Sequence, residues 1–177
     1  MNDDRMSNGQ SSNGQLSNGP GDGTEDGDAL ALGRQLCFAV YSAAHAFNRV
    51  YKPLLERFGL TYPQYLVLLC LWQRDQRTVK GIGEELRLDS GTLSPLLKRL
   101  EAAGFVSRTR DAGDERQVII TLTPKGTGLK PEAFGILTEI GKACGCSLEE
   151  AAMLRTALGE LHRNLDENLP TRGGGQR

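Results

Sequence analysis

The clearest hydrophobic pattern of the chain lies between residues 79 and 102 and has a helical period. A first apolar stripe predicts a short helix over residues 79–87, through Val79, Ile82 and Leu86. Residues 88–91 predict a turn, in which Ser90 is a good N-cap for a second helix. The inward side of that second helix is marked by Leu93, Leu96, Leu97 and Leu100. Two helices joined by a short turn predict a helix-turn-helix.

The opposite side of the second helix carries the residue types that a DNA-reading helix needs. Small residues allow close approach, hydroxyls donate or accept hydrogen bonds, and cations meet phosphates or guanine edges. The candidate DNA-binding residues are Ser90, Thr92, Ser94, Pro95, Lys98 and Arg99. Pro95 lacks a backbone donor, but it lies in the first turns of the helix, where that loss is tolerated.

Beyond Ala103-Gly104 the period changes to alternation, which predicts strands over residues 106–110 and 116–123. The turn between them is charged, and such a hairpin beside a major-groove helix can reach an adjacent minor groove as a wing. Arg116 is expected to insert there, held by Asp114. The structural alternative is a surface ion pair that stabilises the hairpin. Thr123-Pro124 then predicts the start of another helix.

Helical patterns flank this unit on both sides. Residues 30–58 predict one long helix, bent near Pro53, and Thr61 begins the next. Residues 66–72 are apolar nearly all round, so Cys70 is expected to be buried packing. Residues 124–143 predict a helix interrupted by Pro131, Gly135 and Gly141.

The final predicted helix begins with a capping box, Ser147 to Glu150, and runs to about Leu169. It carries one long apolar stripe of Leu148, Ala151, Leu154, Leu158, Leu161 and Leu165. A single small domain does not need to bury so long a stripe on an end helix. We therefore expect a homodimer whose interface includes this helix and the first one.

Composition separates the ends of the chain from its centre. Of 177 residues 38% are hydrophobic, and residues 1–28 contain few large apolar side chains, which predicts a disordered arm. This arm holds six acids and one arginine, a charge of −5, so the total of −1 leaves +4 for the rest. A mildly basic remainder suits a nucleic-acid partner. Neither a signal peptide nor a membrane-length stretch is visible, so the protein is expected to be cytoplasmic, without a membrane partner.

Four cysteines in a cytoplasmic chain are not expected to form structural disulfides. On sequence alone Cys37 is best interpreted as a small core residue. Cys144 and Cys146 have three interpretations: loop thiols, a resolving pair, or metal ligands together with His45 and His162. One Cys-x-Cys with scattered histidines is a poor zinc signature, so no metal or other cofactor is expected.

Two longer segments resemble the MarR-type regulators. They are residues 88–104, and Asp114-Glu-Arg116 followed by Leu122-Thr-Pro-Lys-Gly126, and the resemblance covers about residues 30–169. It implies a mainly α fold, a winged helix-turn-helix with an intertwined helical dimerisation region. A homodimer would present two recognition helices roughly 34–36 Å apart to a palindromic double-stranded operator. The predicted regions are the arm 1–28, N-terminal helices 29–77, the DNA-binding region 78–126, dimerisation helices 127–170 and a disordered tail 171–177.

Residues 36–41, 50–55 and 60–66 further resemble the organic hydroperoxide resistance regulators, a peroxide-sensing branch of that family. The resemblance implies that Cys37 is the redox sensor and that Tyr51 and Tyr62 of the partner subunit hydrogen-bond to it. It also implies a C-terminal resolving thiol, for which Cys144 and Cys146 are the two candidates.

Simple helix geometry agrees with an arrangement across two subunits. Cys37 and Tyr51 are 14 residues apart on one predicted helix, or about 21 Å at 1.5 Å per residue. They cannot touch within one straight helix, whereas Tyr41, one turn after Cys37, can reach the thiol from its own chain.

The sequence thus predicts a repressor, not an enzyme, that binds its operator while Cys37 is reduced. An organic hydroperoxide would oxidise Cys37 to a sulfenic acid, and an intersubunit disulfide would then release the DNA. One alternative is a repressor released by a noncovalent small aromatic ligand in the dimer cleft. The other is a thiol-dependent peroxidase, against which the wing argues.

Overall fold

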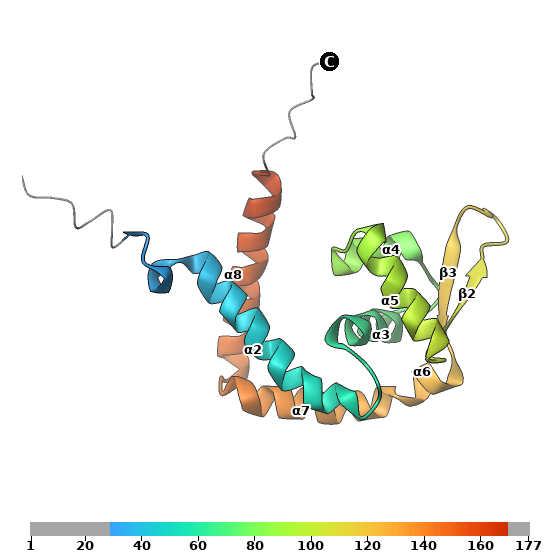
Figure 1. Cartoon of the computed structure of the whole chain (residues 1–177), viewed down its shortest axis with the longest axis horizontal. Helices are drawn as coiled ribbons and strands as arrows, with labels where there is room; N and C mark the ends of the chain where they lie inside the picture. Colours follow the sequence, from blue (N-terminus) through green and yellow to red (C-terminus); the bar gives the residue numbers. More distant parts are fainter. Residues whose placement is uncertain (1–28, 170–177) are drawn as a thin grey trace, which may run out of the picture. The chain divides into compact units, whose positions relative to one another are not determined.

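The computed structural model describes residues 29–169, so the predicted arm and tail lie outside the described residues. The fold is mainly α, as predicted, and it contains one antiparallel sheet, which has three strands (Figure 1). A boundary between two compact units falls within α2, between Ala43 and Ala44. The elements are η1 (Leu32–Arg34), α2 (Leu36–Glu56), α3 (Tyr62–Gln73), β1 (Arg77–Thr78), α4 (Val79–Leu86), α5 (Ser90–Ala102), β2 (Val106–Arg110), β3 (Val118–Leu122), α6 (Pro124–Gly128), α7 (Lys130–Cys144) and α8 (Leu148–Glu167).

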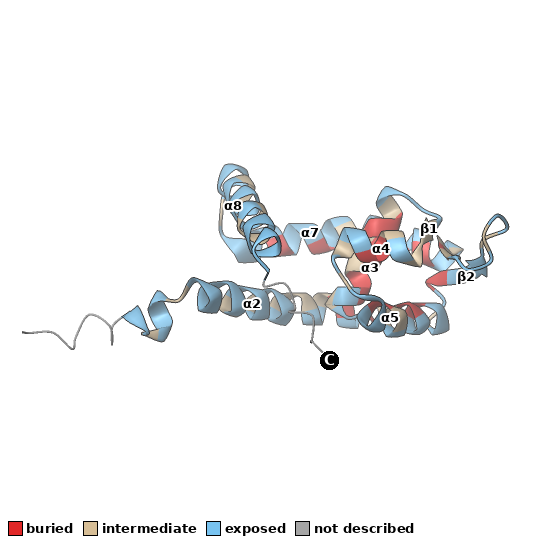
Figure 2. Cartoon of the chain, turned by 90° about the horizontal axis from the view of Figure 1, so that it is seen from above, coloured by how far each residue is buried: buried red, intermediate tan, exposed pale blue. Residues whose placement is uncertain are grey.

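The core lies where α3, α4 and α5 pack against the sheet, and buried positions concentrate there (Figure 2). The apolar stripes of the sequence supply it, since Ile82 of α4, Leu93, Leu97 and Leu100 of α5 and Ile120 of β3 are at most 1% exposed. Burying a leucine or isoleucine side chain contributes about 1.5–3 kcal/mol, so these contacts fix α5 against the rest of the unit.

Hydrogen bonds at the N-terminus of α5 correct one prediction. Asp89, not Ser90, is the N-cap, and its carboxylate accepts the Thr92 N–H at 2.9 Å and the Thr92 hydroxyl at 2.7 Å. Ser90 is instead the first residue of the helix. A carboxylate here also faces the positive end of the helix dipole, which favours aspartate over serine.

The sheet has the strand order β1-β3-β2, and β1 is a strand that we did not predict. It consists of two residues, Arg77 and Thr78, paired with Ile120 and Ile119 of β3. The predicted strand 116–123 was too long, because β3 begins only at Val118. Asp114 prolongs the turn: its carbonyl accepts the Gln117 N–H at 2.8 Å and its carboxylate accepts the Arg116 N–H at 3.1 Å.

The predicted long first helix is divided, because the short helix η1 precedes α2. Pro53 does not end α2, which continues to Glu56 with Leu55 fully buried in the core. Gly135 and Gly141 do not interrupt α7 either, and Pro131 lies in its first turn. The break in that region falls at Leu129, between α6 and α7.

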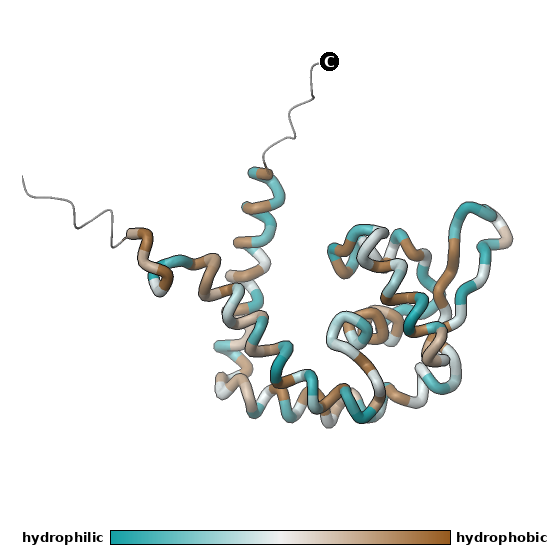
Figure 3. Tube along the Cα trace, viewed as in Figure 1, coloured by the Kyte–Doolittle hydropathy of each residue, from teal (hydrophilic) through white to brown (hydrophobic). Residues whose placement is uncertain are grey.

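Large apolar side chains on several helices remain exposed in the single chain. α7 buries only Ile136 and Ile140, and α8 buries no residue. Hydrophobic positions nevertheless recur along α8 (Figure 3). The exposed ones there include Leu148, Met153, Leu154, Leu158 and Leu165.

None of the helices within residues 29–169 has the length and apolar character needed to cross a membrane.

Candidate functional site

A cleft separates the start of the recognition helix α5 from the β2–β3 hairpin. It has a volume of about 970 Å³ and is lined by α4, the turn after it, α5 and the hairpin. Ser90 and Ser94 border it from α5, and Arg116 borders it from the hairpin. The structure therefore brings together residues from both predicted DNA-contacting segments, although 22 positions separate Ser94 from Arg116 in the sequence.

The predicted DNA-binding residues of α5 are exposed or half-buried. Ser90, Thr92, Pro95, Lys98 and Arg99 are exposed, and Ser94 is half-buried. The Thr92 hydroxyl and backbone hold the pKa of the Asp89 carboxyl below its usual range. The cap is therefore charged at neutral pH, and the N-terminus of α5 keeps a fixed orientation.

In the wing, Asp114 acts on the backbone of the turn and on Gln117. Its two carboxylate oxygens accept the Arg116 N–H and the Gln117 side-chain amide, each at 3.1 Å. Asp111 stabilises the other side of the turn by accepting the Gly113 N–H at 2.6 Å. No ion pair within residues 29–169 involves the Arg116 guanidinium, so this exposed cation is available to an external anion.

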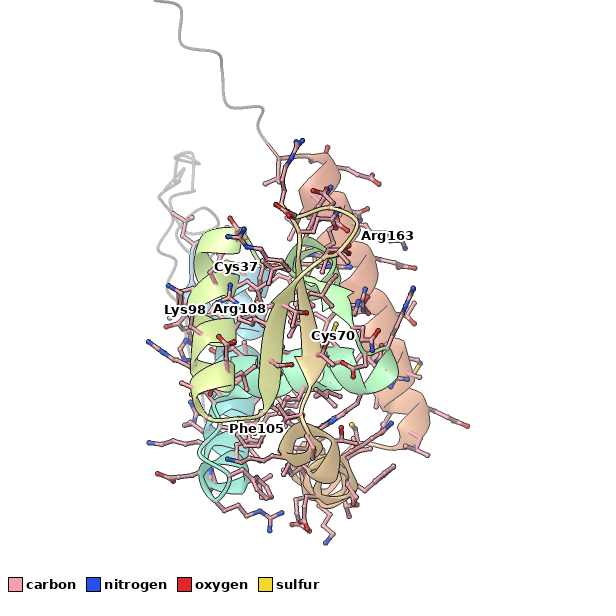
Figure 4. All side chains as sticks on the ribbon, turned by 90° about the vertical axis from the view of Figure 1, so that its right-hand side faces the viewer. Cys37, Cys70, Lys98, Phe105, Arg108 and Arg163 are labelled. Carbon is pink, nitrogen blue, oxygen red and sulfur yellow. The ribbon has the colours of Figure 1, made fainter. Side chains whose placement is uncertain are left out.

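The cleft is also lined by three cations that the sequence analysis did not identify: Lys80, Arg87 and Arg108. Arg108 reaches from β2 toward α5, where its Nη1 lies 3.8 Å from Glu101 Oε2 (Figure 4). Strand alternation could have identified it, because Arg108 and Arg110 lie on one face of the strand. Arg87 ends α4 with a φ of 55°, which orients the turn toward α5.

A separate cluster of aromatic residues joins α2 to α3. The rings of Tyr51 and Tyr62 stack with centroids 4.3 Å apart, and Tyr65 lies 5.9 Å from Tyr51. Tyr65 also meets Trp72 edge to face at 6.0 Å. The two tyrosines predicted for the sensor pocket are thus neighbours, although α2 ends and α3 begins between them.

Burial is the main cause that raises the pKa of Tyr51 to about 12, followed by the charges of Tyr62, Tyr65 and Cys144. Burial also raises the pKa of Tyr62. Both phenols therefore keep their protons at neutral pH and can donate hydrogen bonds. The contribution of Cys144, the last residue of α7, is the smallest of these causes.

The four cysteines have different environments, and all are free thiols. Cys37 is exposed on α2, as is Tyr41 one turn later. Cys144 is exposed at the last residue of α7, which Gly145 terminates with a φ of 63°, and Cys146 is half-buried.

Cys70 is buried, as predicted, but it has a polar neighbour. Arg77 Nη1 donates to its Sγ at 3.2 Å and also contacts Glu85 at 3.0 Å. Burial raises the Cys70 pKa and Arg77 partly opposes that effect. A shielded thiol of raised pKa is a poor nucleophile, which agrees with a packing role.

A smaller cavity of about 420 Å³ borders Tyr62. Its polar lining includes Asn48, Lys52 and Glu56 of α2 and Thr61, and Leu60 and Pro63 are among its apolar residues. This volume falls within the range of small-molecule sites. Across residues 29–169 no three histidine, cysteine or acidic side chains group in a way that could hold a metal ion.

The family described as transcriptional regulator SarA/Rot matches residues 49–133. The chain is 54% identical over 138 residues to the HTH-type transcriptional regulator TtmR of Methylorubrum extorquens, covering 78% of this chain and 71% of that protein. It is 44% identical over 140 residues to the organic hydroperoxide resistance transcriptional regulator of Bacillus subtilis, covering 77% and 95%.

Among solved structures, the chain resembles AbfR of Staphylococcus epidermidis in two states. Against reduced AbfR bound to DNA the TM-score is 0.69 at 37% identity, with 82% of this chain and 99% of that chain covered. Against disulfide-formed AbfR the TM-score is 0.54 at 38% identity, covering 80% and 94%. The similarity is therefore higher to the reduced state.

Proposed function

Since the chain belongs to the MarR family of transcriptional regulators, whose members bind DNA, we propose that it is a repressor that senses organic hydroperoxides through Cys37. The observation that carries this proposal is the stacked pair Tyr51 and Tyr62. It occurs in a chain that is 44% identical to a regulator named for organic hydroperoxide resistance.

The proposed DNA interface is the exposed side of α5 together with the wing. Lys98 and Arg99 would contact phosphates or guanine edges in the major groove, and Ser90, Thr92, Ser94 and Pro95 would lie against it. Arg116 would enter the adjacent minor groove, while Asp114 orders the turn that carries it. The cations around the cleft support this assignment because they add positive potential between the two segments.

A homodimer is typical of the family, and the exposed apolar side chains of this chain support it. Leu154 and Leu158 of α8 are 57% and 49% exposed in the single chain. A second copy would cover these side chains, and two symmetric recognition helices would favour a palindromic operator.

In the proposed sensor, Cys37 of one subunit lies against Tyr51 and Tyr62 of the other. Two phenolic O–H groups that donate to the sulfur favour its thiolate form, and Tyr41 can add a contact from the same chain as Cys37. The raised pKa of Tyr51 supports this role, since a phenol that stays neutral keeps its donor.

The redox chemistry would proceed in two balanced steps. The Cys37 thiolate attacks a peroxide oxygen, the O–O bond breaks, and the departing alkoxide takes up a proton and leaves as an alcohol. The sulfur has lost two electrons and is now a sulfenic acid. A thiolate of the partner subunit then attacks this sulfur, an S–S bond forms, and hydroxide leaves and is protonated to water.

Cys144 is the better candidate for that second thiolate. Its charge contributes to the raised pKa of Tyr51, and among the described residues the causes of that shift do not include Cys146. If Tyr51 of one subunit adjoins Cys37 of the partner subunit, this contribution favours Cys144 as the thiol nearer to that sulfur. A disulfide needs Cα atoms within about 7 Å, so the resolving thiol has to lie close to Cys37 of the partner.

Nonreducing electrophoresis of peroxide-treated protein tests this scheme. Wild-type protein and Cys146→Ser should give a covalent dimer, whereas Cys37→Ser and Cys144→Ser should not. A covalent dimer in Cys144→Ser that disappears in Cys146→Ser would instead assign the resolving role to Cys146. Absence of any Cys37-dependent oxidation would contradict the sensor assignment.

The 420 Å³ cavity beside Tyr62 favours one other function, release by a noncovalent aromatic ligand. Lys52 on its lining would suit a carboxylate on such a ligand. Operator release by an aromatic acid from fully reduced Cys37→Ser protein would support this alternative. A thiol peroxidase would instead show sustained peroxide turnover with a thiol reductant.

A further inference from the structure

Trp72, the single tryptophan of the chain, connects α3 to α6 and α7, the first two helices after the wing. Its indole Nε1–H donates to the Gly126 carbonyl of α6 at 3.0 Å. Its own carbonyl accepts from Lys130 Nζ, in the first turn of α7, at 3.1 Å. Its ring packs edge to face on Tyr65. One residue thus touches α6, α7 and the tyrosine cluster.

Hydrogen bonds connect the start of α6 to the segment that follows the C-terminus of the recognition helix α5. The Thr123 hydroxyl donates to the Gly104 carbonyl at 2.6 Å, and Lys125 Nζ donates to the Ala103 carbonyl at 2.7 Å. Gly126 is so close to the chain after α5 that an added Cβ would lie 2.1 Å from the Phe105 carbonyl oxygen. α6 lies beside the end of α5 (Figure 1), and these close contacts couple the positions of the two segments.

The opposite end of α7 is the candidate redox site. α7 runs from Lys130 to Cys144, a rigid rod of about 21 Å at 1.5 Å per residue. It begins at the Trp72 junction and ends at Cys144, whose charge contributes to the raised pKa of Tyr51. If Cys144 is displaced, α7 moves as a rigid helix and Lys130 at its other end moves with it, because an unbroken helix transmits motion along its axis better than a loop does.

We propose that Trp72 is a coupling residue, which transmits the displacement of α7 during disulfide formation to α6 and so to the recognition helix. This inference rests on the proposed redox function but goes beyond it, since it concerns how the signal reaches the DNA. Two polar contacts of one residue, through its indole N–H to α6 and through its backbone carbonyl to α7, couple the orientation of α6 to the position of α7. Without them, α7 can shift while α6 and α5 stay in place.

The test uses full-length protein in reduced and peroxide-oxidised forms, with operator affinity and disulfide yield measured on the same samples. Trp72→Phe keeps an aromatic ring against Tyr65 and removes the N–H donor. Lys130→Met removes the second contact. Lys142→Met is the matched control, because that α7 lysine pairs with Glu139 and not with the Trp72 junction.

We expect reduced Trp72→Phe and Lys130→Met to bind the operator within about threefold of wild type and to form the disulfide in equal yield. Oxidation lowers operator affinity by some factor in each protein. In Trp72→Phe and Lys130→Met that factor should be at least ten times smaller than in wild type and Lys142→Met. Equal loss of affinity in all four proteins would overturn the coupling role. A reduced Trp72→Phe protein that is folded but binds the operator poorly would also overturn it, since Trp72 would then only support the DNA-binding fold.

Trp72 fluorescence in wild-type protein provides a second readout that needs no variant. Because this is the chain's one tryptophan, its emission reports on the junction directly. We expect an emission change that tracks disulfide formation and is absent in Cys144→Ser. Unchanged emission during disulfide-dependent release would contradict the coupling, whereas failure of wild type to form the disulfide would contradict the proposed function itself.

Discussion

Tyr51 and Tyr62 stack within one chain with ring centroids 4.3 Å apart and planes inclined by 28°. They lie on different helices, α2 and α3, and their contact places two phenolic groups side by side at one half-buried site. Burial disfavours ionisation of both phenols and raises the pKa of each, and the pKa of Tyr51 is raised further by the charge of Tyr62.

The first prediction concerns the titration of this pair. The Tyr51 pKa is raised from 10.0 to about 12, with burial as the largest cause and Tyr62 as the next. Because the folded-state pKa exceeds the unfolded value, the stabilisation by neutral Tyr51 is complete below pH 10 and is lost as the pH rises toward 12. Spectrophotometric titration of tyrosinate should show one late step that is missing in Tyr51→Phe.

Tyr62→Phe is the matched variant for this experiment. It keeps a ring stacked on Tyr51 but removes a phenol whose charge opposes ionisation of Tyr51. The late step should therefore move to lower pH in Tyr62→Phe. If it moved to higher pH, or if all tyrosines of wild type titrated together near pH 10, the buried stacked pair would not exist in solution.

The second prediction concerns Arg116 in the wing. Replacing it with alanine should weaken operator binding by about 1–3 kcal/mol and lower the salt dependence by about one unit of slope. The melting temperature should stay close to that of wild type, because Arg116 is exposed and makes no ion pair within residues 29–169. Fluorescence anisotropy with labelled operator at several salt concentrations measures both quantities.

Arg163→Ala provides the control, since it removes the same charge from an exposed position of α8 (Figure 4). Its operator affinity should equal that of wild type. Equal weakening in both variants would mean that net charge alone is responsible, and the wing would lose its assigned contact.

The third prediction concerns the apolar stripe of α8. Leu158 is 49% exposed in the single chain, and a second subunit is proposed to cover it. Leu158→Asp should shift the protein from dimer to monomer in light scattering, because burying an unpaired carboxylate is costly. Thr156→Asp, an exposed change on another side of the same helix, should remain dimeric. A dimeric Leu158→Asp protein would place the interface elsewhere.

Much of the DNA-binding fold follows from short-range patterns. The leucine stripe of the second predicted helix identified Leu93, Leu97 and Leu100 as core residues, because a helical period dictates which positions share a face. β1 could not be found in this way, since a two-residue strand has no period and exists only through its pairing with β3. The choice of Asp89 over Ser90 as cap also depended on backbone angles that either residue type permits.

The candidate sensor was harder to predict from the residues alone. Cys37 has the pattern of a core position, yet its side chain is exposed in the single chain. Resemblance indicated Tyr51 and Tyr62, but only the folded chain showed their stacking. Spacing from Cys37 slightly favoured Cys144, and the position of Cys146 before the last helix favoured Cys146 on electrostatic grounds; the contribution of Cys144 to the raised pKa of Tyr51 adds to the case for Cys144. These features depend on contacts between segments that are distant in the sequence, and local sequence patterns do not predict such contacts.

The redox account is tested most directly by operator binding of wild-type and Cys37→Ser protein before and after treatment with an organic hydroperoxide. Serine keeps the size of the side chain but has no sulfur to oxidise. Reduced wild type and Cys37→Ser should bind the operator equally, and peroxide should release only wild type, with recovery after thiol reduction. Peroxide-induced release that persists in Cys37→Ser, or wild-type binding that survives complete oxidation of Cys37, would contradict the account.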